Sequence, residues 1–169
     1  MSSTVSIRVA ADDDVRVAME LVRACIVEMR RDGIDQWDDL YPDEMTLRAD
    51  IRERTMYVTS DDAGVCGTFV LNEYQLPEYV DAFWTITDTP VAVVHRLMVH
   101  PRKQHQGIAR QLMDAAELHA LALGFGAIRL DAFAHNPRAL RLYEYLGYRD
   151  AGGVMLRKGL FRCFEKRLR

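Results

Sequence analysis

The segment 90–133 constrains the fold most, because a strand pattern, a helix pattern and a second strand pattern follow one another within it. The β-branched run PVAVVHRLMV (90–99) predicts a central strand, and AIRLDAF (127–133) predicts the next one. Between them, apolar residues recur at helical spacing up to Gly124, which ends the predicted helix: Ala109, Leu112, Met113, Ala116, Ala120 and Leu123. This order of elements requires a right-handed crossover and some parallel pairing.

The chain before residue 90 predicts a strand, two helices and a β-hairpin. VSIRVA (5–10) alternates apolar and polar residues as a strand does, and residues 43–53 predict a short helix. TMYVTS (55–60) and VCGTFVLN (65–72), joined by DDAG, predict the hairpin. The acids of ADDD offer N-caps for the first helix, whose apolar face is Ala18, Leu21, Val22, Cys25 and Met29.

The C-terminal part predicts one more helix and two closing strands. Asn136 is a suitable N-cap with Pro137 at the first helical position, and Gly147 ends the helix. YRDAGGVML and LFRCFEKRL then predict an antiparallel pair. The predicted order is β-α-α-β-β-β-α-β-α-β-β, an α+β fold with a mixed sheet. No repeat or linker interrupts it, so residues 1–169 are expected to form a single domain.

Composition excludes several classes of protein. The chain has 169 residues, a net charge of −3 and a pI near 5.9, which argues against a dedicated nucleic-acid binder. Its three cysteines lack CxxC spacing, so we expect no disulfide framework and no metal site. Neither a signal peptide nor a membrane span is expected, and the reducing cytoplasm is the predicted compartment.

The stretch HPRKQHQGIARQLM (100–113) has the character of an anion site. It leads from a predicted strand into a predicted helix, where backbone N–H groups lack partners and the helix dipole favours negative charge. Gly107 lets a ligand approach the backbone, and no Asp or Glu occurs between Thr89 and Met113. Phosphate is the natural occupant. Taken alone, the same pattern fits an ordinary solvated helix start.

A second segment, NPRALRLYEYLGY (136–148), makes the pattern more specific. Together, QHQGIA and this segment resemble two signatures of the GNAT superfamily of N-acetyltransferases, Q/R-x-x-G-x-G/A and N-x-x-A-x-x-x-Y-x-x-x-G-F/Y. HRLMVHP is similar to the strand that leads into the first signature. Ala109 stands where many members have a second glycine, and His105 and Gln106 replace commoner residues. The resemblance implies a mostly antiparallel mixed sheet flanked by helices.

The resemblance also implies acetyl-CoA as co-substrate and assigns residues to it. The backbone of Leu97, Met98 and Val99 would pair with the pantetheine arm. Asn136 would contact the cofactor, and Tyr143 would lie near the thioester sulfur. Backbone amides would wrap the pyrophosphate in a loop made of Gln104, His105, Gln106, Gly107, Ile108, Ala109 and Arg110.

Acetyl transfer to an amine needs a donor to the carbonyl oxygen, a base and an acid. A strand N–H, of Val99 or Met98, is the predicted carbonyl donor, and Tyr143 is the predicted acid. His95 and Asp131 are both candidates for the base, and ordered water is a third. Each side chain also has a structural interpretation: Tyr143 as a core tyrosine, His95 as a strand histidine and Asp131 as the partner of Arg96 or Arg129.

The acceptor is expected to be a primary amine of a small molecule, acetylated by direct transfer in a ternary complex. A protein or peptide acceptor and a non-catalytic acyl-CoA sensor are the alternatives, and a homodimer is one option for the oligomeric state. The acceptor pocket is expected around the first two helices and residues 70–86. Aromatic and acidic side chains concentrate there: Trp37, Tyr41, Tyr74, Tyr79, Trp84, Asp38, Asp39, Glu73, Glu78 and Asp81.

Overall fold

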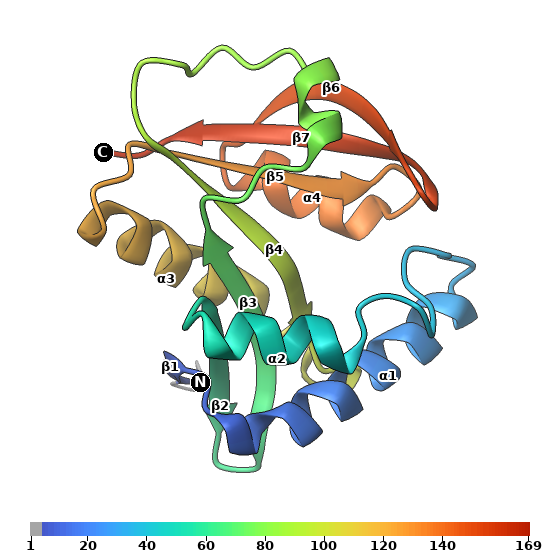
Figure 1. Ribbon diagram of the computed structural model, residues 1–169. Helices are drawn as coiled ribbons and strands as arrows, with labels where there is room; N and C mark the ends of the chain where they lie inside the picture. The colour runs from blue at the N-terminus through green and yellow to red at the C-terminus, as the bar shows by residue number, and fades with distance from the viewer. Residues whose placement is uncertain (1–4) are drawn as a thin grey trace. The chain divides into compact units, whose positions relative to one another are not determined.

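The computed structural model describes residues 5–169 and has the predicted α+β fold. Seven strands form one sheet in the order β1-β2-β3-β4-β5-β7-β6. The pairs β1–β2, β2–β3, β5–β7 and β6–β7 are antiparallel, and β4–β5 is parallel. The mixed, mostly antiparallel sheet and the predicted order of strands and longer helices are therefore confirmed (Figure 1).

The chain divides into two compact units, which are described in turn. Unit 1 contains the residues up to Leu71 together with Arg96–Ala115, and unit 2 contains Asn72–His95 and Ala116–Arg169. The division passes through strand β4 (Val91–Val99) and helix α3 (Ile108–Ala122). The expectation of a single domain stays a prediction.

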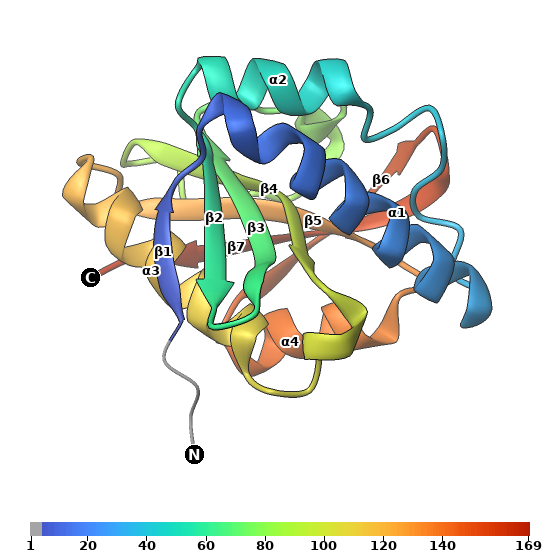
Figure 2. The ribbon, with the colours of Figure 1, turned by 90° about the horizontal axis from the view of Figure 1, so that it is seen from below.

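Unit 1 places two helices against a small antiparallel sheet. Strands β1 (Ser6–Val9), β2 (Met56–Asp61) and β3 (Gly64–Asn72) lie side by side (Figure 2). Helices α1 (Val15–Arg31) and α2 (Glu44–Arg52) contact each other, and Asp43 caps α2 by accepting from the Thr46 amide at 2.8 Å. The core combines the apolar faces of both helices with strand residues that include Leu21, Val22, Leu47, Met56, Val58 and Val70.

Unit 2 is built around strand β5 (Ala127–Phe133), which pairs along its whole length with β7 (Gly159–Arg167). Strand β6 (Arg149–Leu156) pairs with the other edge of β7, and helix α4 (Pro137–Tyr145) contacts β5. Asn136 caps α4 as predicted, accepting from the Ala139 amide at 3.3 Å. Within α4, Tyr143 is the buried residue.

Strand β4 departs from a regular strand at one residue. Its parallel register with β5 covers Val91–Val93, paired with Ala127–Arg129. At Arg96 the backbone has φ 49°, a left-handed conformation that is uncommon for a non-glycine residue. Because this residue interrupts the pleat, side chains do not simply alternate between the two faces of the sheet from His95 to Leu97. Met98 and Val99, neighbours in sequence, are both buried.

Three short 3-10 helices were not predicted. They are η1 (Asp12–Asp14), η2 (Pro77–Asp81) and η3 (Pro101–Lys103). Two of them begin with proline, which fixes φ and suits a first helical turn. Runs this short lack a repeated apolar spacing, so periodicity could not reveal them.

Candidate functional site

The loop between β4 and α3 has the backbone conformation of an anion-binding turn. Here the phosphate loop means Gln104–Arg110, all of it in unit 1. His105 has φ 63° and Gly107 has φ 79°, so left-handed residues flank Gln106. Successive N–H groups in such turns form concave anion sites. A Cβ added at Gly107 would meet no atom within 4 Å, so the space above this backbone is open.

Five consecutive backbone N–H groups of the phosphate loop, from His105 to Ala109, have no acceptor within residues 5–169. The Gly107 carbonyl accepts the first helical bond, from the Gln111 amide at 3.1 Å, so α3 begins directly after the glycine. His105, Gln106 and Gly107 are exposed. The loop therefore presents donors to solvent and can hold a phosphate through its backbone.

The basic side chains near the phosphate loop are not all free to attract an anion. Lys103 pairs with Asp61 of β2 at 2.6 Å, and this contact raises the pKa of Lys103 and lowers that of Asp61. Arg102 is exposed, and its backbone N–H donates to His100 Nδ1 at 3.1 Å. The Lys103–Asp61 pair anchors the start of the loop to the hairpin, so the Lys103 charge is already engaged with a carboxylate.

The strand segment Leu97–Val99 is fixed on one side by unit 1. The Val99 carbonyl accepts from Cys25 Sγ at 3.4 Å and from Gln104 Nε2 at 3.2 Å. The Met98 carbonyl lies 3.0 Å from where a Cβ at Gly67 would stand, so strand β3 needs a glycine there. The backbone that leads into the phosphate loop is thus held by side chains of α1 and of the loop itself.

Tyr143 is 6% exposed, with its ring packed against Tyr148 and Phe164 at centroid distances of 5.9 and 5.7 Å. Its hydroxyl has no hydrogen-bond partner within the described part of the chain. Burial raises the pKa of Tyr143, and the charge of Asp131 raises it further, so the phenol stays protonated at neutral pH. The structure therefore offers an uncommitted O–H donor in unit 2.

Asp131 belongs to what we call the buried acid cluster, formed by Tyr79, Asp131, Tyr143 and Cys163 of unit 2. The Tyr79 hydroxyl donates to Asp131 Oδ2 at 2.6 Å, and Cys163 lies opposite Asp131 in the β5–β7 register. Burial raises the pKa of Asp131 although Tyr79 opposes the rise, and burial with the nearby carboxyl raises the pKa of Cys163 to about 12. A raised pKa makes a carboxylate a better proton acceptor, which keeps Asp131 a candidate for proton transfer.

The predicted structural partners of Asp131 are wrong. Arg96 pairs with Asp50 of α2, while Arg129 donates to Gln75 Oε1 at 2.7 Å and to the Ile86 carbonyl at 3.0 Å. The error has a physical reason. The residues that bind these arginines come from around position 50 and from 75–86, which are far from the arginines in sequence but close to them in the fold.

His95 is half-buried, and its Nε2 lies 2.8 Å from Asn72 Oδ1. Because an amide oxygen only accepts, this contact places the proton of a neutral imidazole on Nε2. The Tyr74 ring lies 6.3 Å away. The structure tests neither His95 nor Asp131 as a base, and both stay predictions, as do the cofactor roles of Asn136 and of the strand and loop residues.

The aromatic residues expected in an acceptor pocket have different environments. Trp37 belongs to the core of unit 1, and Tyr79 is buried, with its hydroxyl engaged by Asp131. Trp84 donates to the Tyr79 carbonyl at 2.7 Å and lies under the Arg129 guanidinium. Tyr41 and Tyr74 are exposed, at 38% and 59%. These two keep the accessible rings that contact with an acceptor requires.

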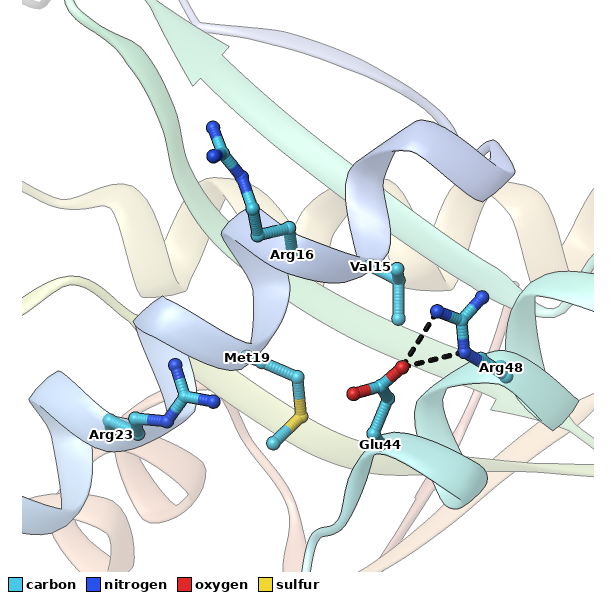
Figure 3. Close-up of a pocket in the computed structure, with 6 residues that line it drawn as sticks. All are labelled: Val15, Arg16, Met19, Arg23, Glu44 and Arg48. Atoms are coloured by element: carbon cyan, nitrogen blue, oxygen red, sulfur yellow. Dashed lines mark hydrogen bonds and ion pairs between the residues drawn. The ribbon is translucent and has the colours of Figure 1, made fainter.

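A surface recess of about 210 Å³ lies between α1 and α2, and no predicted site residue lines it (Figure 3). Glu44 pairs with Arg48 there, and the Arg16 side chain points away from this pair. The recess is lined by three arginines and one carboxylate, so its net positive charge disfavours a cationic amine. The lining residues are Val15, Arg16, Met19, Arg23, Glu44 and Arg48.

Two further findings concern residues 5–169. No helix there has the length and apolar character needed to cross a bilayer. No group of three or more His, Cys, Asp or Glu side chains there is placed to hold a metal ion.

The model of the acetyltransferase (GNAT) family matches residues 17–148, which is most of the chain. The chain belongs to this family. The match includes the phosphate loop, His95, Asp131 and Tyr143, and the resemblance inferred from QHQGIA and NPRALRLYEYLGY is therefore confirmed.

Relatives of this GNAT chain agree with the assignment. An uncharacterized N-acetyltransferase of Bacillus subtilis, YycN, is 36% identical over 53 residues, which is 31% of this chain and 34% of that protein. The match thus spans about a third of the curated relative. A GNAT acetyltransferase of Streptococcus agalactiae has the same fold with a TM-score of 0.87, 20% identity, and coverage of 100% of this chain and 98% of that one.

A third relative was solved with a ligand. The putative acetyltransferase YncA of Salmonella typhimurium, solved with its cofactor acetyl-CoA, is 17% identical with a TM-score of 0.73. The similarity covers 99% of this chain and 95% of YncA. At this identity the comparison shows a shared fold.

Sequence reasoning missed two polar clusters of this GNAT chain. Tyr79 was expected near an acceptor but is the hydrogen-bond partner of Asp131, 52 positions away. The buried pair of Arg96 and Asp50 joins β4 to α2. In the sequence, the only indication of this pair is that Asp50 stands next to Ile51 on the apolar face of α2.

Proposed function

We propose that this GNAT chain is an acetyl-CoA-dependent N-acetyltransferase that transfers the acetyl group directly to a primary amine of a small molecule. The observation that carries the proposal is the row of unsatisfied amides from His105 to Ala109, next to an open glycine. Five N–H donors in a left-handed turn at a helix start suit a pyrophosphate. Bound acetyl-CoA supplies an activated acyl group as a thioester.

The phosphate loop, Gln104–Arg110, holds the pyrophosphate in this proposal, mainly through its backbone. The backbone of Leu97–Val99 holds the pantetheine arm, and Asn136 contributes a further contact. A strand N–H, of Met98 or Val99, donates to the acyl oxygen as it gains charge. Holding two reactants in one geometry can itself lower the barrier by about 7–11 kcal/mol.

Tyr143 donates its hydroxyl proton toward the leaving sulfur. A thiol has an unperturbed pKa of about 8.5, below that of a phenol at about 10. Burial raises the pKa of Tyr143, so complete transfer of its proton is uphill. A hydrogen bond from the phenol is sufficient to stabilise the thiolate as it forms. The uncommitted Tyr143 hydroxyl suits this role.

The acceptor amine must lose a proton before or during attack. His95 is the first candidate to accept it, and the half-buried carboxyl of Asp131 is the second. Ordered water is the third. Tyr41 and Tyr74, with the acids Asp38, Asp39 and Glu73, are proposed to attract and orient the amine.

The three free cysteines, Cys25, Cys66 and Cys163, are all buried, which suits a reducing cytoplasm as the proposed location. Net negative charge weighs against nucleic acid as a substrate carrier. A protein or peptide acceptor is the second candidate, and a non-catalytic acyl-CoA sensor is the third.

An amine panel tests the proposal. The protein is incubated with acetyl-CoA and with polyamines, amino acids, aryl amines and short peptides, and release of free thiol is followed. Thiol release that depends on a small amine supports the proposal, while release with peptides alone supports the second candidate. Tight acetyl-CoA binding without thiol release for any amine would indicate a sensor.

A further inference from the structure

Arg96 has an unusual backbone for a residue inside a strand. Three non-glycine residues have positive φ in the described part of the chain: Arg54 follows α2, His105 lies in the phosphate loop, and Arg96 lies within β4. The left-handed conformation is unfavourable for any residue with a Cβ. Such a conformation persists where the surroundings hold it.

The Arg96 side chain supplies three contacts within unit 1. Its Nε and one terminal nitrogen donate to the two oxygens of Asp50 at 2.9 and 2.6 Å. Its other terminal nitrogen donates to the Tyr41 hydroxyl at 2.8 Å. The guanidinium therefore joins β4 to helix α2 and to the connector between α1 and α2.

The Arg96–Asp50 pair is shielded from water, unlike another ion pair on the same helix. The side chains of Arg96 and Asp50 are 11% and 7% exposed, whereas those of Arg48 and Glu44 are 51% and 55% exposed. A forked guanidinium–carboxylate pair is directional as well as attractive. Exposed pairs contribute little. Burial raises the pKa of Asp50, and Arg96 opposes this, so the pair depends on both partners.

The position of Arg96 in the sequence gives this pair a consequence for the site. Leu97 follows directly, so the backbone direction at residue 96 sets where the N–H and C=O groups of Leu97–Val99 point. Tyr41 stands in the connector, where the Asp38 amide donates to the Tyr41 carbonyl at 3.1 Å. The same guanidinium therefore contacts a residue of the proposed acceptor region.

We propose that Arg96 is a positioning residue: its fork on Asp50 holds β4 in the left-handed conformation that presents Leu97–Val99 to the pantetheine arm, and its bond to Tyr41 orders the acceptor connector. This inference rests on the proposed function. The guanidinium of Arg96 would thus place both the backbone that binds acetyl-CoA and an aromatic side chain that contacts the amine.

Two double variants that differ by one Cβ test the first part. Arg96→Ala with Asp50→Asn and Arg96→Gly with Asp50→Asn both remove the ion pair, but glycine adopts φ near 49° without strain. Calorimetry should show that the glycine variant binds acetyl-CoA at least about fivefold more tightly than the alanine variant. This factor corresponds to the smallest cost of holding a residue with a Cβ in the left-handed conformation. Arg48→Ala removes the exposed pair and should bind as the wild type does.

Equal acetyl-CoA affinity in the two double variants, with wild-type binding intact, overturns this inference alone. Failure of the wild type to bind acetyl-CoA overturns the proposed function and this inference with it. If circular dichroism shows that the double variants do not fold, Arg96→Lys replaces them, since lysine keeps the charge and loses the fork. Wild-type affinity in Arg96→Lys overturns the inference.

Tyr41→Phe tests the second part, because it deletes only the hydroxyl that Arg96 binds. The KM for the amine should rise while the acetyl-CoA dissociation constant and kcat stay near wild type. A merely structural role would lower the melting temperature and leave the amine KM unchanged, and that result would overturn the link to the acceptor connector.

Discussion

The phosphate loop and the buried acid cluster are built in opposite ways. The loop consists of seven consecutive residues, from Gln104 to Arg110, and its functional groups are backbone amides, three of them in the exposed residues His105, Gln106 and Gly107. The cluster draws Tyr79, Asp131, Tyr143 and Cys163 from four separate segments, and its functional groups are side chains, of which Asp131 is half-buried and the other three are buried.

This difference decides which changes each region tolerates. An amide is present in every residue except proline, so the loop depends on conformation and open space more than on side-chain identity. The cluster depends on particular titratable groups whose pKa values are shifted by burial and by one another. Substitutions in the loop should therefore change binding, and those in the cluster should change chemistry or pH dependence.

The largest expected effect comes from Tyr143→Phe in the cluster. Loss of the hydroxyl should lower kcat by roughly 10²-fold or more, the usual range for a positioned acid. Acetyl-CoA affinity should stay near wild type. The melting temperature should hold as well, because this hydroxyl has no partner in the described residues and the ring is kept.

Tyr148→Phe is the matched control for that change. The Tyr148 hydroxyl donates to Glu117 Oε1 at 3.0 Å, so its loss should cost about 1 kcal/mol of stability and leave kcat unchanged. Measuring kcat and melting temperature for both variants separates chemistry from packing. Full activity in Tyr143→Phe would end the acid assignment.

Gly107→Glu in the loop should have the next largest effect. It places a carboxylate in the open space above the free amides, and acetyl-CoA affinity should fall at least about tenfold, or 1.4 kcal/mol. Calorimetry measures this directly.

Gly124→Glu controls for backbone strain, because Gly124 has φ 91° and equally open space beyond the other end of α3. Both variants introduce a side chain and a charge at a left-handed position. Only the change at Gly107 should weaken acetyl-CoA. Equal losses of affinity in the two variants would remove the site from the phosphate loop.

His95→Ala should have a smaller effect on activity, and the loss should be largest at the higher pH values where the wild type has a neutral imidazole. If His95 takes the proton, the kcat/KM profile of the variant loses its acid limb. Its kcat/KM should fall by less than the roughly 10²-fold typical of general acid–base catalysis, because water can share the task. Asp131→Asn is the parallel variant. A wild-type acid limb in His95→Ala would clear this residue and direct attention to Asp131 or to water.

The smallest effect is a dependence of stability on pH at Asp131. Burial raises its folded pKa above the unfolded value of about 3.9. The folded state then binds the proton more tightly, so this contribution to stability is present at low pH and lost as pH rises through the folded pKa. The unfolding free energy of Asp131→Asn minus wild type should therefore increase with pH, by about 1.4 kcal/mol per unit between the two pKa values.

Asp61→Asn should show the opposite trend. Lys103 lowers the folded pKa of Asp61, so that carboxylate stabilises the fold above the unfolded pKa and loses its effect as pH falls. Urea unfolding at several pH values measures both differences. A flat difference for Asp131→Asn would contradict a raised pKa for this acid.

Local pattern determined the elements of this protein and the family to which it belongs. Apolar spacing, N-caps such as Asp43 and Asn136, and the glycines that end α3 and α4 act within a few residues of one another. The phosphate loop could be predicted for the same reason, since its donors belong to consecutive residues. The two signatures fall on the loop and on α4 because both are local structures.

Only the tertiary structure decided which side chains meet. Asp131 receives Tyr79 from a 3-10 helix that lacks periodicity, and Arg96 receives Asp50 from 46 positions away. The left-handed turn at Arg96 arises inside a run that reads as an unbroken strand. Hydrogen bonds and ion pairs of this kind depend on distances in space, and the distance between two residues along the chain does not set them.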